Sequence, residues 1–507
     1  MKYATWAIVA FVTLMRGFAA WKLPLTGDEA YYWEWAKHLA LGYADHPPMV
    51  AYLIFPLDWV TANPLFVRLG FLICGVVATL AAAGAAKRIT GDERAGMVTA
   101  LAMTLAPMLS VGFVIATPDG PLMASWALCL YLAVRASQTG GRRDFVLLGA
   151  AMAFALLSKM FAWALVAGIA GWALMPQHRA LWRRGLSLSF ALAAVLYAPF
   201  LVWNAEHHWV SFVFAFEQRH VAEPSLYRPF TYLLANAGAY SPGLWIAALL
   251  ILVRPRHALI GWTAIPLSAL LILLNLHERI ELHWFFGPYV SLAVGMGVAF
   301  EDLSHRARVL WATAGAVPAA VLIPFLFLAA AFPGQLYSQF RATGSSLRNS
   351  GPFEIFTYWP LAQDVKRMAD ANDAIVVTDG YGFSSQMDFE AGIPPVVIGY
   401  AHQGQEARHW YDVEMHPRRI LFVDKEPLVP RPGHPDDKQG RPDFRDRLAA
   451  ACGRVRAGPV LGYMYTDPTG HSVPARTYFL TWCDDPRPNA IRFLRWEDAG
   501  ASRTASR

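Results

Sequence analysis

Apolar segments that approach the thickness of a lipid bilayer recur throughout residues 1–334. Examples are Phe71–Ala86, Ala95–Ala116, Leu192–Trp203 and Ala307–Phe332, with short polar connectors between them. A helix needs about 20 mostly apolar residues to cross the hydrocarbon core of a membrane. Soluble domains usually carry about 25% charged residues, whereas this chain carries 16%. We therefore predict an all-α polytopic membrane domain over residues 1–334.

The composition changes after residue 334, where the long apolar segments stop and charged residues and prolines become frequent. Ile375–Thr378 and Pro395–Ile398 are typical of strands, and Leu361–Ala371 is typical of a helix. Tyr381-Gly382-Phe383 reads as a loop near a strand end, and no GxGxxG or P-loop pattern indicates a nucleotide site there. Residues 335–507 are therefore predicted to form a water-soluble α/β domain.

The net charge of +6 comes from the predicted membrane domain alone. Residues 335–507 contain 21 Lys/Arg and 21 Asp/Glu, whereas residues 1–334 contain 22 and 16. No basic patch interleaved with aromatic residues appears, which argues against nucleic acid as a partner. The excess of positive charge instead follows the rule that cytoplasmic connectors of membrane proteins are rich in Lys and Arg.

Eleven spans with a cytoplasmic amino terminus account for this charge distribution. They fall near residues 4–21, 65–86, 95–116, 120–135, 145–157, 160–175, 186–204, 232–252, 258–276, 284–300 and 308–332. The cytoplasmic side then holds 14 of the 22 basic residues of the domain, and the opposite side holds 11 of its 16 acidic residues. We read Met1–Trp21 as an uncleaved span because Arg16 interrupts its apolar core and no small-residue cleavage site follows. The chain is thus predicted to lie in a bacterial inner membrane, with a periplasmic first loop over residues 22–64 and a periplasmic C-terminal domain.

Phe145–Met175 is predicted to form a helical hairpin rather than one span. As a single helix its 31 residues would be about 46 Å long, whereas the hydrocarbon core is about 30 Å thick. Only Ser158-Lys159 breaks the apolar stretch. We expect Lys159 near the outer tip of the hairpin, slightly below the membrane surface. A cation between two apolar arms is costly, which indicates an anionic ligand.

Polar groups collect in the loops that this topology places outside. They include Asp28, Glu29, Tyr43, Asp45, His46, Asp119, Lys159 and Arg219. Several have alternative explanations that do not involve function. Thr26–Glu29 can be the capped start of an aromatic amphipathic helix on the membrane surface, and Asp119 can be part of a Pro-Asp-Gly turn or a cap. Arg219 can extend to lipid headgroups.

The histidines of these loops suggest a metal site, which the residue patterns do not support. They are His46, His207, His208, His277 and His283. Neither an HExxH motif nor a Cys/His cluster is present, so no metal ligand is predicted. We expect no cofactor, and a divalent metal stays an open alternative.

A carboxylate and several cations on one membrane face suit the transfer of a sugar from a lipid phosphate. In that reaction a base takes the proton of the acceptor hydroxyl while cations stabilise the departing phosphate. A polytopic transporter or flippase of lipid-linked sugars is the alternative. No repeat relates the two halves of the chain, and the ionisable residues lie at one face rather than at the midplane, which argues against transport.

These loop motifs resemble those of one family when taken in their order along the chain. They are Asp28-Glu29-Ala30-Tyr31-Tyr32-Trp33, Asp45-His46-Pro47-Pro48, Thr117-Pro118-Asp119, Leu157-Ser158-Lys159, Trp203-Asn204 and Glu217-Gln218-Arg219. The chain resembles the C-type (GT-C) integral-membrane glycosyltransferases related to protein O-mannosyltransferases. Within them it is similar to the branch with the lipid A aminoarabinose transferases and the rhizobial galacturonosyltransferases. The resemblance covers most of residues 20–300.

The resemblance implies a metal-independent or weakly metal-linked, inverting transfer from a polyprenyl-phosphate sugar to an envelope acceptor on the periplasmic side of the bilayer. The acceptor class stays open among lipid A, another glycan, a lipid and a protein. Asp28 would be the general base, with Lys159, Arg219 and His46 on the donor phosphate. Glu29, Asp45, Asp119 and Tyr43 would support them. The aminoarabinose transferases have a phosphate-binding Lys before a Pro-Pro pair, where this chain has His46.

The four cysteines divide between the two predicted domains. Cys74 and Cys129 fall within spans and are expected to be packing residues. Cys452 and Cys483 lie in the domain that the topology places in the oxidising periplasm. We predict that they form a disulfide.

Overall fold

A computed structural model gives the fold as two compact units, each described here by itself. The helical unit comprises Met1–Leu23 and Leu39–Phe327, and the C-terminal unit comprises Pro24–His38 and Leu328–Arg507. The structure describes residues 2–58, 63–215, 223–310, single positions between 313 and 328, 351–378, 380–397, 410–411, 418–425, 428, 448–466 and 472–494. The predicted domain boundary after residue 334 lies outside the described residues.

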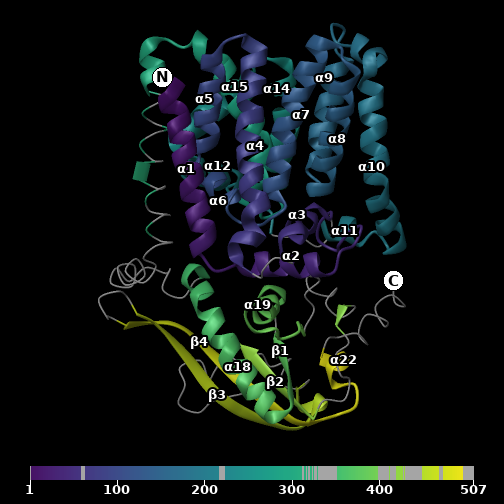
Figure 1. Cartoon of the computed structure of the whole chain (residues 1–507), viewed down its shortest axis with the longest axis vertical. Coiled ribbons are helices and arrows are strands. Elements are labelled where there is room, and N and C mark those ends of the chain that lie inside the picture. Colours follow the sequence, from purple (N-terminus) through teal and green to yellow (C-terminus); the bar gives the residue numbers. More distant parts are fainter. Residues whose placement is uncertain are drawn as a thin grey trace. The chain divides into compact units, whose positions relative to one another are not determined.

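The helical unit consists of helices joined by short connections (Figure 1). These are α1 (Lys2–Lys22), α3 (Met49–Asp58), α4 (Pro64–Thr90), α5 (Glu93–Leu105), α6 (Pro107–Gly112), α7 (Asp119–Thr139), α8 (Arg142–Ser158), α9 (Ala162–Leu174), α10 (Ser187–Glu206), α11 (Val210–Val213), α12 (Arg228–Tyr240), α13 (Pro242–Val253), α14 (Ala258–Leu274) and α15 (Phe286–Ala299). The predicted spans up to residue 300 all lie on these helices. The segment 308–332 lies mostly outside the described residues.

Local sequence explains where the helices begin and break. Pro107 begins α6 directly after α5, and Pro242 begins α13 directly after α12, so two predicted spans are each divided. Proline has no backbone N–H, and the first turn of a helix leaves that group unpaired in any case, so Pro107 and Pro242 fit at these helix starts. The predicted break at Lys159 is confirmed, because α8 ends at Ser158 and the backbone of Lys159 is extended.

Buried polar side chains connect the helices of this unit. The indole of Trp126 on α7 donates to Ser291 Oγ on α15 at 2.8 Å, and Ser291 Oγ lies 2.8 Å from Thr263 Oγ1 on α14. Arg68 on α4 donates to the carbonyl oxygens of Ala20 and Leu23, which end α1. In an apolar environment such groups need internal partners, and here the partners join neighbouring helices.

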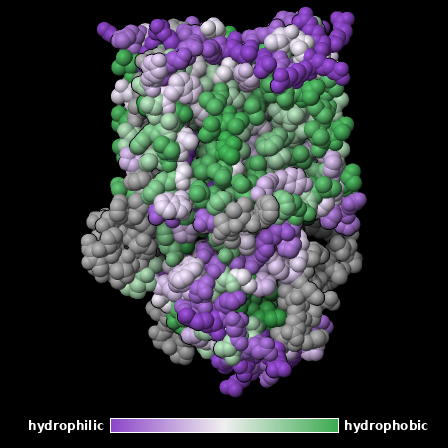
Figure 2. All heavy atoms as spheres, viewed as in Figure 1, coloured by the Kyte–Doolittle hydropathy of each residue, from purple (hydrophilic) through white to green (hydrophobic). Residues whose placement is uncertain are grey.

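The surface of the helical unit has the polarity of a membrane protein. On the face that Figure 2 shows, an apolar belt crosses the unit, with a hydrophilic band at the end where the amino terminus lies. Among the described residues, four helices are long and apolar enough to cross a membrane, or up to five if the bent pair α13–α14 is one span. The chain is thus a multi-pass membrane protein in its composition and fold, and the count of eleven spans stays a prediction.

Ion pairs and hydrogen bonds join connectors that the topology assigns to the same side. Lys2 and Lys87 both pair with Glu93, at 3.0 and 2.8 Å, and all three belong to predicted cytoplasmic segments. In contrast, Ser211 Oγ donates to the carbonyl oxygen of Tyr43, and both belong to predicted outer loops. Figure 1 shows α3 and α11 at the end of the helical unit opposite the amino terminus. The separation of the two faces therefore agrees with the charge distribution.

The C-terminal unit is built around a four-stranded sheet. Its elements are α2 (Gly27–Lys37), α18 (Tyr358–Asn372), β1 (Ala374–Thr378), α19 (Tyr381–Ala391), β2 (Arg419–Asp424), β3 (Cys452–Thr466), β4 (Ser472–Pro486) and α22 (Ala490–Leu494). The strand order is β1-β2-β4-β3, with β1 parallel to β2 and the other pairs antiparallel.

Alternating side chains of the strands form a core on each face of this sheet. On β2, Leu421 and Val423 join the core of α18 and α19, and Ile420 and Phe422 join the core that contains Ile491 of α22. This period of two is the geometry of a strand that is buried on both faces. Residues 380–391 were expected to begin with a loop, but α19 begins at Tyr381 instead.

Two further predictions in this unit have different outcomes. The predicted strand Ile375–Thr378 and the predicted helix Leu361–Ala371 correspond to β1 and α18. In Pro395–Ile398, Val397 forms only an isolated bridge to Thr378, and Ile398 lies outside the described residues.

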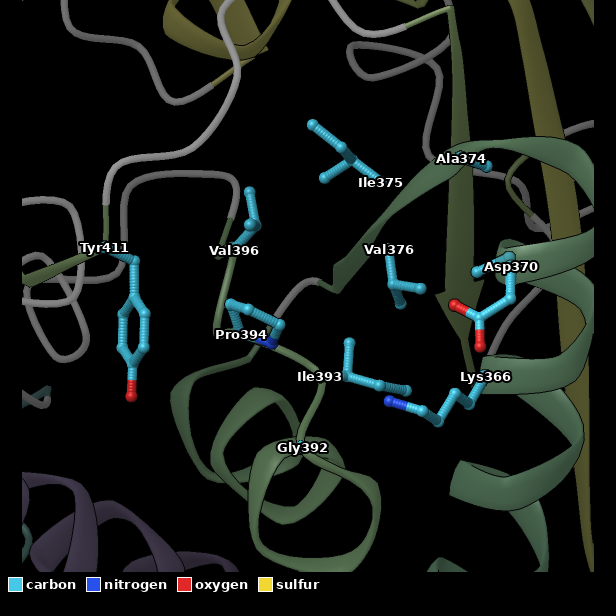
Figure 3. A pocket seen from close by; sticks show the side chains of 11 residues that line it. Lys366, Asp370, Ala374, Ile375, Val376, Gly392, Ile393, Pro394, Val396 and Tyr411 are labelled. Atoms are coloured by element: carbon cyan, nitrogen blue, oxygen red, sulfur yellow. The ribbon is translucent and has the colours of Figure 1, made fainter.

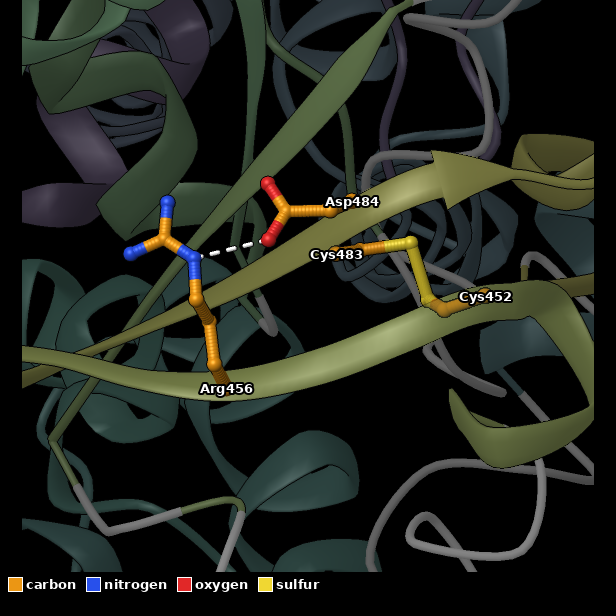
Figure 4. The surroundings of a disulfide bond; sticks show 4 residues. All are labelled: Cys452, Arg456, Cys483 and Asp484. Carbon is orange, nitrogen blue, oxygen red and sulfur yellow. Dashed lines mark hydrogen bonds and ion pairs between the residues drawn. A yellow bond between two sulfur atoms is a disulfide. The ribbon is translucent and has the colours of Figure 1, made fainter.

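The predicted disulfide between Cys452 and Cys483 is confirmed. It joins the start of β3 to β4, with Cα atoms 5.4 Å apart and a sequence separation of 31 residues (Figure 4). Beside it, Arg456 on β3 donates to Asp484 on β4 at 2.7 Å. Cys74 and Cys129 are free and buried, as expected for packing residues.

We predict that replacing both Cys452 and Cys483 by Ser destabilises the C-terminal unit. A crosslink over a segment of this size stabilises a fold by about 2–4 kcal/mol, mainly by restricting the unfolded chain. Limited proteolysis of the purified protein should cleave the variant within this unit sooner than the wild type. Cys74→Ala, a matched change in the helical unit, should leave cleavage of the C-terminal unit unchanged. Two free thiols at positions 452 and 483 in a non-reducing peptide map would contradict the assignment.

Candidate active site

Asp28 and Glu29 are neighbours in the sequence with different roles at the start of α2. Thr26 precedes the helix, and its hydroxyl accepts a hydrogen bond from the backbone N–H of Glu29. The Glu29 carboxylate accepts one in return from the backbone N–H of Thr26, at 2.9 Å. This reciprocal pair is a capping box, which satisfies two donors that the helix leaves open. Glu29 is fully buried, whereas Asp28 is exposed and takes no part in the cap.

The carboxylate of Asp28 is held by a residue far away in the sequence. The hydroxyl of Tyr381, the first residue of α19, donates to Asp28 Oδ1 at 2.8 Å. The Tyr381 ring also packs against the Tyr31 ring of α2, with centroids 4.7 Å apart. The capped helix start was therefore a correct expectation, but it accounts for Glu29 and not for Asp28.

The aromatic residues of α2 are buried rather than spread on a surface. All residues from Glu29 to Ala36 are buried. Trp33 packs edge-to-face on Phe389 of α19, with ring centroids 5.0 Å apart. The alternative of an amphipathic helix lying on the membrane is therefore wrong for the face that contacts α19.

At its other end, α2 contributes to a buried cluster of ionisable groups. Lys37 forms an ion pair with Asp388 of α19 and lies 3.6 Å from Glu34. The Tyr411 hydroxyl contacts both carboxylates, Asp388 at 2.9 Å and Glu34 in a shorter contact. Burial, together with the adjacent Asp388, raises the pKa of Glu34 from its ordinary value of 4.5 to about 9. Glu34 is therefore protonated at neutral pH, so its carboxyl group can donate a hydrogen bond within the cluster.

Tyr411 also lines a cavity of about 320 Å³ in the same unit (Figure 3). Lys366 and Asp370 of α18 line it, with Ile393 and Pro394 from the segment after α19. The Lys366 ammonium donates to the carbonyl oxygen of Ala391 at 3.0 Å. This contact gives Lys366 a role in holding the end of α19.

In the helical unit, the predicted phosphate ligand Lys159 lies beside Asp119. Lys159 is 3% exposed, and its ammonium donates to Asp119 Oδ1 at 2.7 Å. His283 Nε2 lies 4.0 Å from the other oxygen of Asp119. Asp119 is in the first turn of α7, one residue after the N-cap Pro118. The alternative of a turn is present, because the backbone N–H of Gly120 donates to the carbonyl oxygen of Thr117 at 3.3 Å. The Asp119 carboxylate in addition holds the buried cation.

The segment from Gly42 to His46 packs against the end of α10 and the start of α11. Tyr43, Asp45 and His46 are all buried. The backbone carbonyl of Tyr43 accepts from Ser211 Oγ at 2.7 Å. A Cβ atom on Gly42 would lie 2.4 Å from the Trp203 ring, so this approach requires glycine. The loop is therefore fixed by packing against residues 203–211.

Two of the predicted site residues, Arg219 and Asp28, are not among the described residues of the helical unit. Arg219 lies outside the described residues. Asp28 belongs to the C-terminal unit, whereas Lys159, Asp119 and His46 belong to the helical unit.

In the parts of the chain that the structure describes, no group of three or more His, Cys, Asp or Glu side chains could hold a metal ion. A divalent metal therefore stays an open alternative.

Three comparisons with known proteins, with a family model, with a relative and with solved structures, agree with the resemblance of the loop motifs. Residues 45–203 match the model of the family described as dolichyl-phosphate-mannose-protein mannosyltransferase. Lipid A galacturonosyltransferase RgtD of Rhizobium johnstonii is 25% identical to this chain over 299 residues. That match covers 55% of this chain and 63% of the relative, which is less than two thirds of its length.

The fold is similar to that of two solved structures of ArnT. ArnT from Cupriavidus metallidurans in the apo state matches 95% of this chain and 98% of that chain, with a TM-score of 0.64 and 16% identity. The same protein bound to undecaprenyl phosphate matches 94% of this chain and 97% of that chain, with a TM-score of 0.59 and 17% identity. These findings confirm the resemblance to C-type integral-membrane glycosyltransferases.

We predict that the Asp119–Lys159 pair is coupled strongly enough to be seen in a double-mutant cycle. Removing one partner of a buried ion pair leaves an uncompensated charge and costs about 3–5 kcal/mol, whereas removing both does not. Asp119→Leu and Lys159→Met should each lower the melting temperature of the purified protein in detergent. The double variant should recover part of that loss. Melting temperatures that fall additively would contradict the coupling.

We predict that Glu34→Gln makes the C-terminal unit less sensitive to alkaline pH. Because folding raises the pKa of Glu34 from 4.5 to about 9, its contribution to stability is complete below pH 4.5 and is lost as the pH rises towards 9. Glutamine keeps a donor and an acceptor and does not titrate. The melting temperature of the variant relative to wild type should therefore rise between pH 5 and 9.

Exposed Glu206→Gln serves as the control for this prediction, since Glu206 lies outside the cluster. Burial also raises the pKa of nearby Glu390 to about 7, and the comparison with wild type removes that common contribution. A difference between Glu34→Gln and wild type that does not depend on pH would show that Glu34 does not titrate in this range.

Proposed function

We propose that this protein is an inverting glycosyltransferase that moves a sugar from a polyprenyl-phosphate donor to an acceptor of the bacterial envelope. The proposal rests on the surroundings of the Asp28 carboxylate. Its neighbour Glu29 is used by the helix cap, whereas Asp28 is exposed and is held by a donor from α19. An exposed carboxylate that the fold does not need for capping suits a general base.

In the proposed reaction, Asp28 accepts the proton of the acceptor hydroxyl. The hydroxyl oxygen forms a bond to C1 of the sugar while the bond from C1 to the phosphate oxygen breaks. The electron pair of that bond leaves with the polyprenyl phosphate, and attack from the opposite side inverts the configuration at C1. Protein cations can carry the charge that develops on the phosphate.

Lys159, His46 and Arg219 are the residues that we propose for the donor phosphate. Lys159 and His46 are both buried in the helical unit, where the lower dielectric strengthens their attraction for an anion. Asp119 holds the Lys159 ammonium in place at 2.7 Å. Tyr43 and Asp45 would support this site from the loop that packs on residues 203–211, and Glu29 would support Asp28 through the helix cap.

The relatives support the donor class and one acceptor class. The ArnT structure with undecaprenyl phosphate supports a polyprenyl-phosphate donor, and RgtD, a lipid A galacturonosyltransferase, supports lipid A as an acceptor. The other envelope acceptors, a glycan, a lipid or a protein, belong to the same proposal. We also propose eleven spans in the inner membrane, with the amino terminus cytoplasmic and the C-terminal domain periplasmic.

The decisive experiment is an Asp28→Asn variant in a defined transfer assay. Purified protein in proteoliposomes would receive undecaprenyl-phosphate-linked galacturonic acid and lipid A, and mass spectrometry would measure the sugar added to lipid A. We expect the variant to lose at least 10²-fold in rate, because asparagine cannot accept the proton.

The matched control is Asp370→Asn, which changes an exposed carboxylate of α18 in the same unit. It should keep the wild-type rate. Full activity of Asp28→Asn would falsify the base assignment. Movement of the lipid-linked sugar across the bilayer without any transfer would favour a flippase.

A further inference from the structure

The start of α2 is fixed to the start of α19 by contacts between backbones. A Cβ atom on Gly382 would lie 2.9 Å from the carbonyl carbon and the Cα atom of Gly27. Such a distance is too short for any side chain, and the atoms it would meet are backbone atoms that cannot turn away. Gln386, one turn further along α19, donates to the carbonyl oxygen of Leu25 at 2.5 Å. Leu25 and Gly27, which precede Asp28, are therefore held by α19.

From this contact we infer that Tyr381 is a positioning residue, which orients the carboxylate of Asp28 for proton transfer. The inference rests on the proposed function, in which Asp28 is the base. It assigns the C-terminal unit a part in catalysis, because α19 belongs to the fold around the sheet. Tyr381 acts through Asp28 and needs no contact with the substrate.

A hydrogen bond to one oxygen can fix the orientation of an exposed carboxylate. The terminal torsion of an aspartate is broad, so the group can rotate between orientations when nothing holds it. The Tyr381 hydroxyl donates to Oδ1 at 2.8 Å. A carboxylate can accept at about four positions, so Oδ2 keeps the capacity to take a proton from an acceptor hydroxyl.

The Tyr381 ring is itself fixed, so its hydroxyl points in one direction. Ring packing on Tyr31 of α2 holds it from one side. The next residue, Gly382, holds the backbone against Gly27. Phenylalanine at position 381 keeps these packing contacts and removes only the hydroxyl. The substitution Tyr381→Phe thus separates positioning from packing.

The first measurement does not require transfer activity. A water-soluble carbodiimide reacts with accessible carboxyl groups, and peptide mass spectrometry can follow the rate at which Asp28 is labelled in the full-length protein at one fixed pH. In Tyr381→Phe we expect Asp28 to be labelled faster, because no hydroxyl then occupies Oδ1 and the carboxylate rotates freely.

A second tyrosine–aspartate pair in the same unit provides a matched control. The Tyr463 hydroxyl donates to Asp364 Oδ2 at 2.8 Å. Tyr463→Phe should speed the labelling of Asp364 and leave that of Asp28 unchanged. It should also leave the transfer rate unchanged.

The second measurement is transfer from undecaprenyl-phosphate-linked galacturonic acid to lipid A. For Tyr381→Phe we expect kcat at neutral pH to fall about tenfold, with KM for the donor within about twofold of wild type. An unchanged kcat, or a loss of kcat with no change in the labelling rate of Asp28, would overturn the positioning role. Asp28→Asn separates the two proposals. If that variant is inactive while Tyr381→Phe behaves as wild type, the inference fails and the base assignment stands.

Discussion

The bilayer imposes the constraint on which the rest of this structure depends. Backbone polar groups have no water to bind inside a membrane, so a chain that crosses it must satisfy them within helices. The apolar segments of residues 1–334 meet this demand, and the charged residues collect in the connectors. Those of one side pair with each other, as Lys2 and Lys87 do with Glu93. Those of the other side provide the polar groups of the proposed site. Polar groups are expected to collect in the connectors because charged side chains are costly inside the bilayer.

A second level of organisation lies in the C-terminal unit, which includes a segment from the beginning of the chain. Pro24–His38 groups with residues after 327, and α2 packs its aromatic residues on α19. One end of α2 carries Asp28 beside Tyr381, and the other carries Glu34 in the cluster with Asp388 and Tyr411. A helix of 11 residues is too short to be stable alone in water. Its conformation, and with it the direction of the Asp28 carboxylate, therefore depends on the sheet domain that α19 belongs to.

The sequence predicted features that local chemistry controls. Apolar periodicity located the helices, and the polar interruption at Lys159 located the break between α8 and α9. The cap at Thr26 follows from its spacing to Glu29. The contact between Asp28 and Tyr381 could not be predicted, because 353 residues separate the two and no local pattern relates them. The strands β3 and β4 were also missed, since glycines, prolines and charged residues interrupt their apolar alternation.

Charge balance explains why the proposed phosphate site needs more than Lys159. The buried ammonium is already compensated by Asp119, so this pair contributes no net positive charge. A departing phosphate monoester carries between one and two negative charges near neutral pH. Stabilising it requires further cationic groups, for which Arg219 and His46 are the proposed sources. His283 Nε2 lies 4.0 Å from Asp119, so the carboxylate that holds Lys159 has a second partner close by. The phosphate site that we propose therefore depends on several groups acting together, because Lys159 alone does not supply the charge.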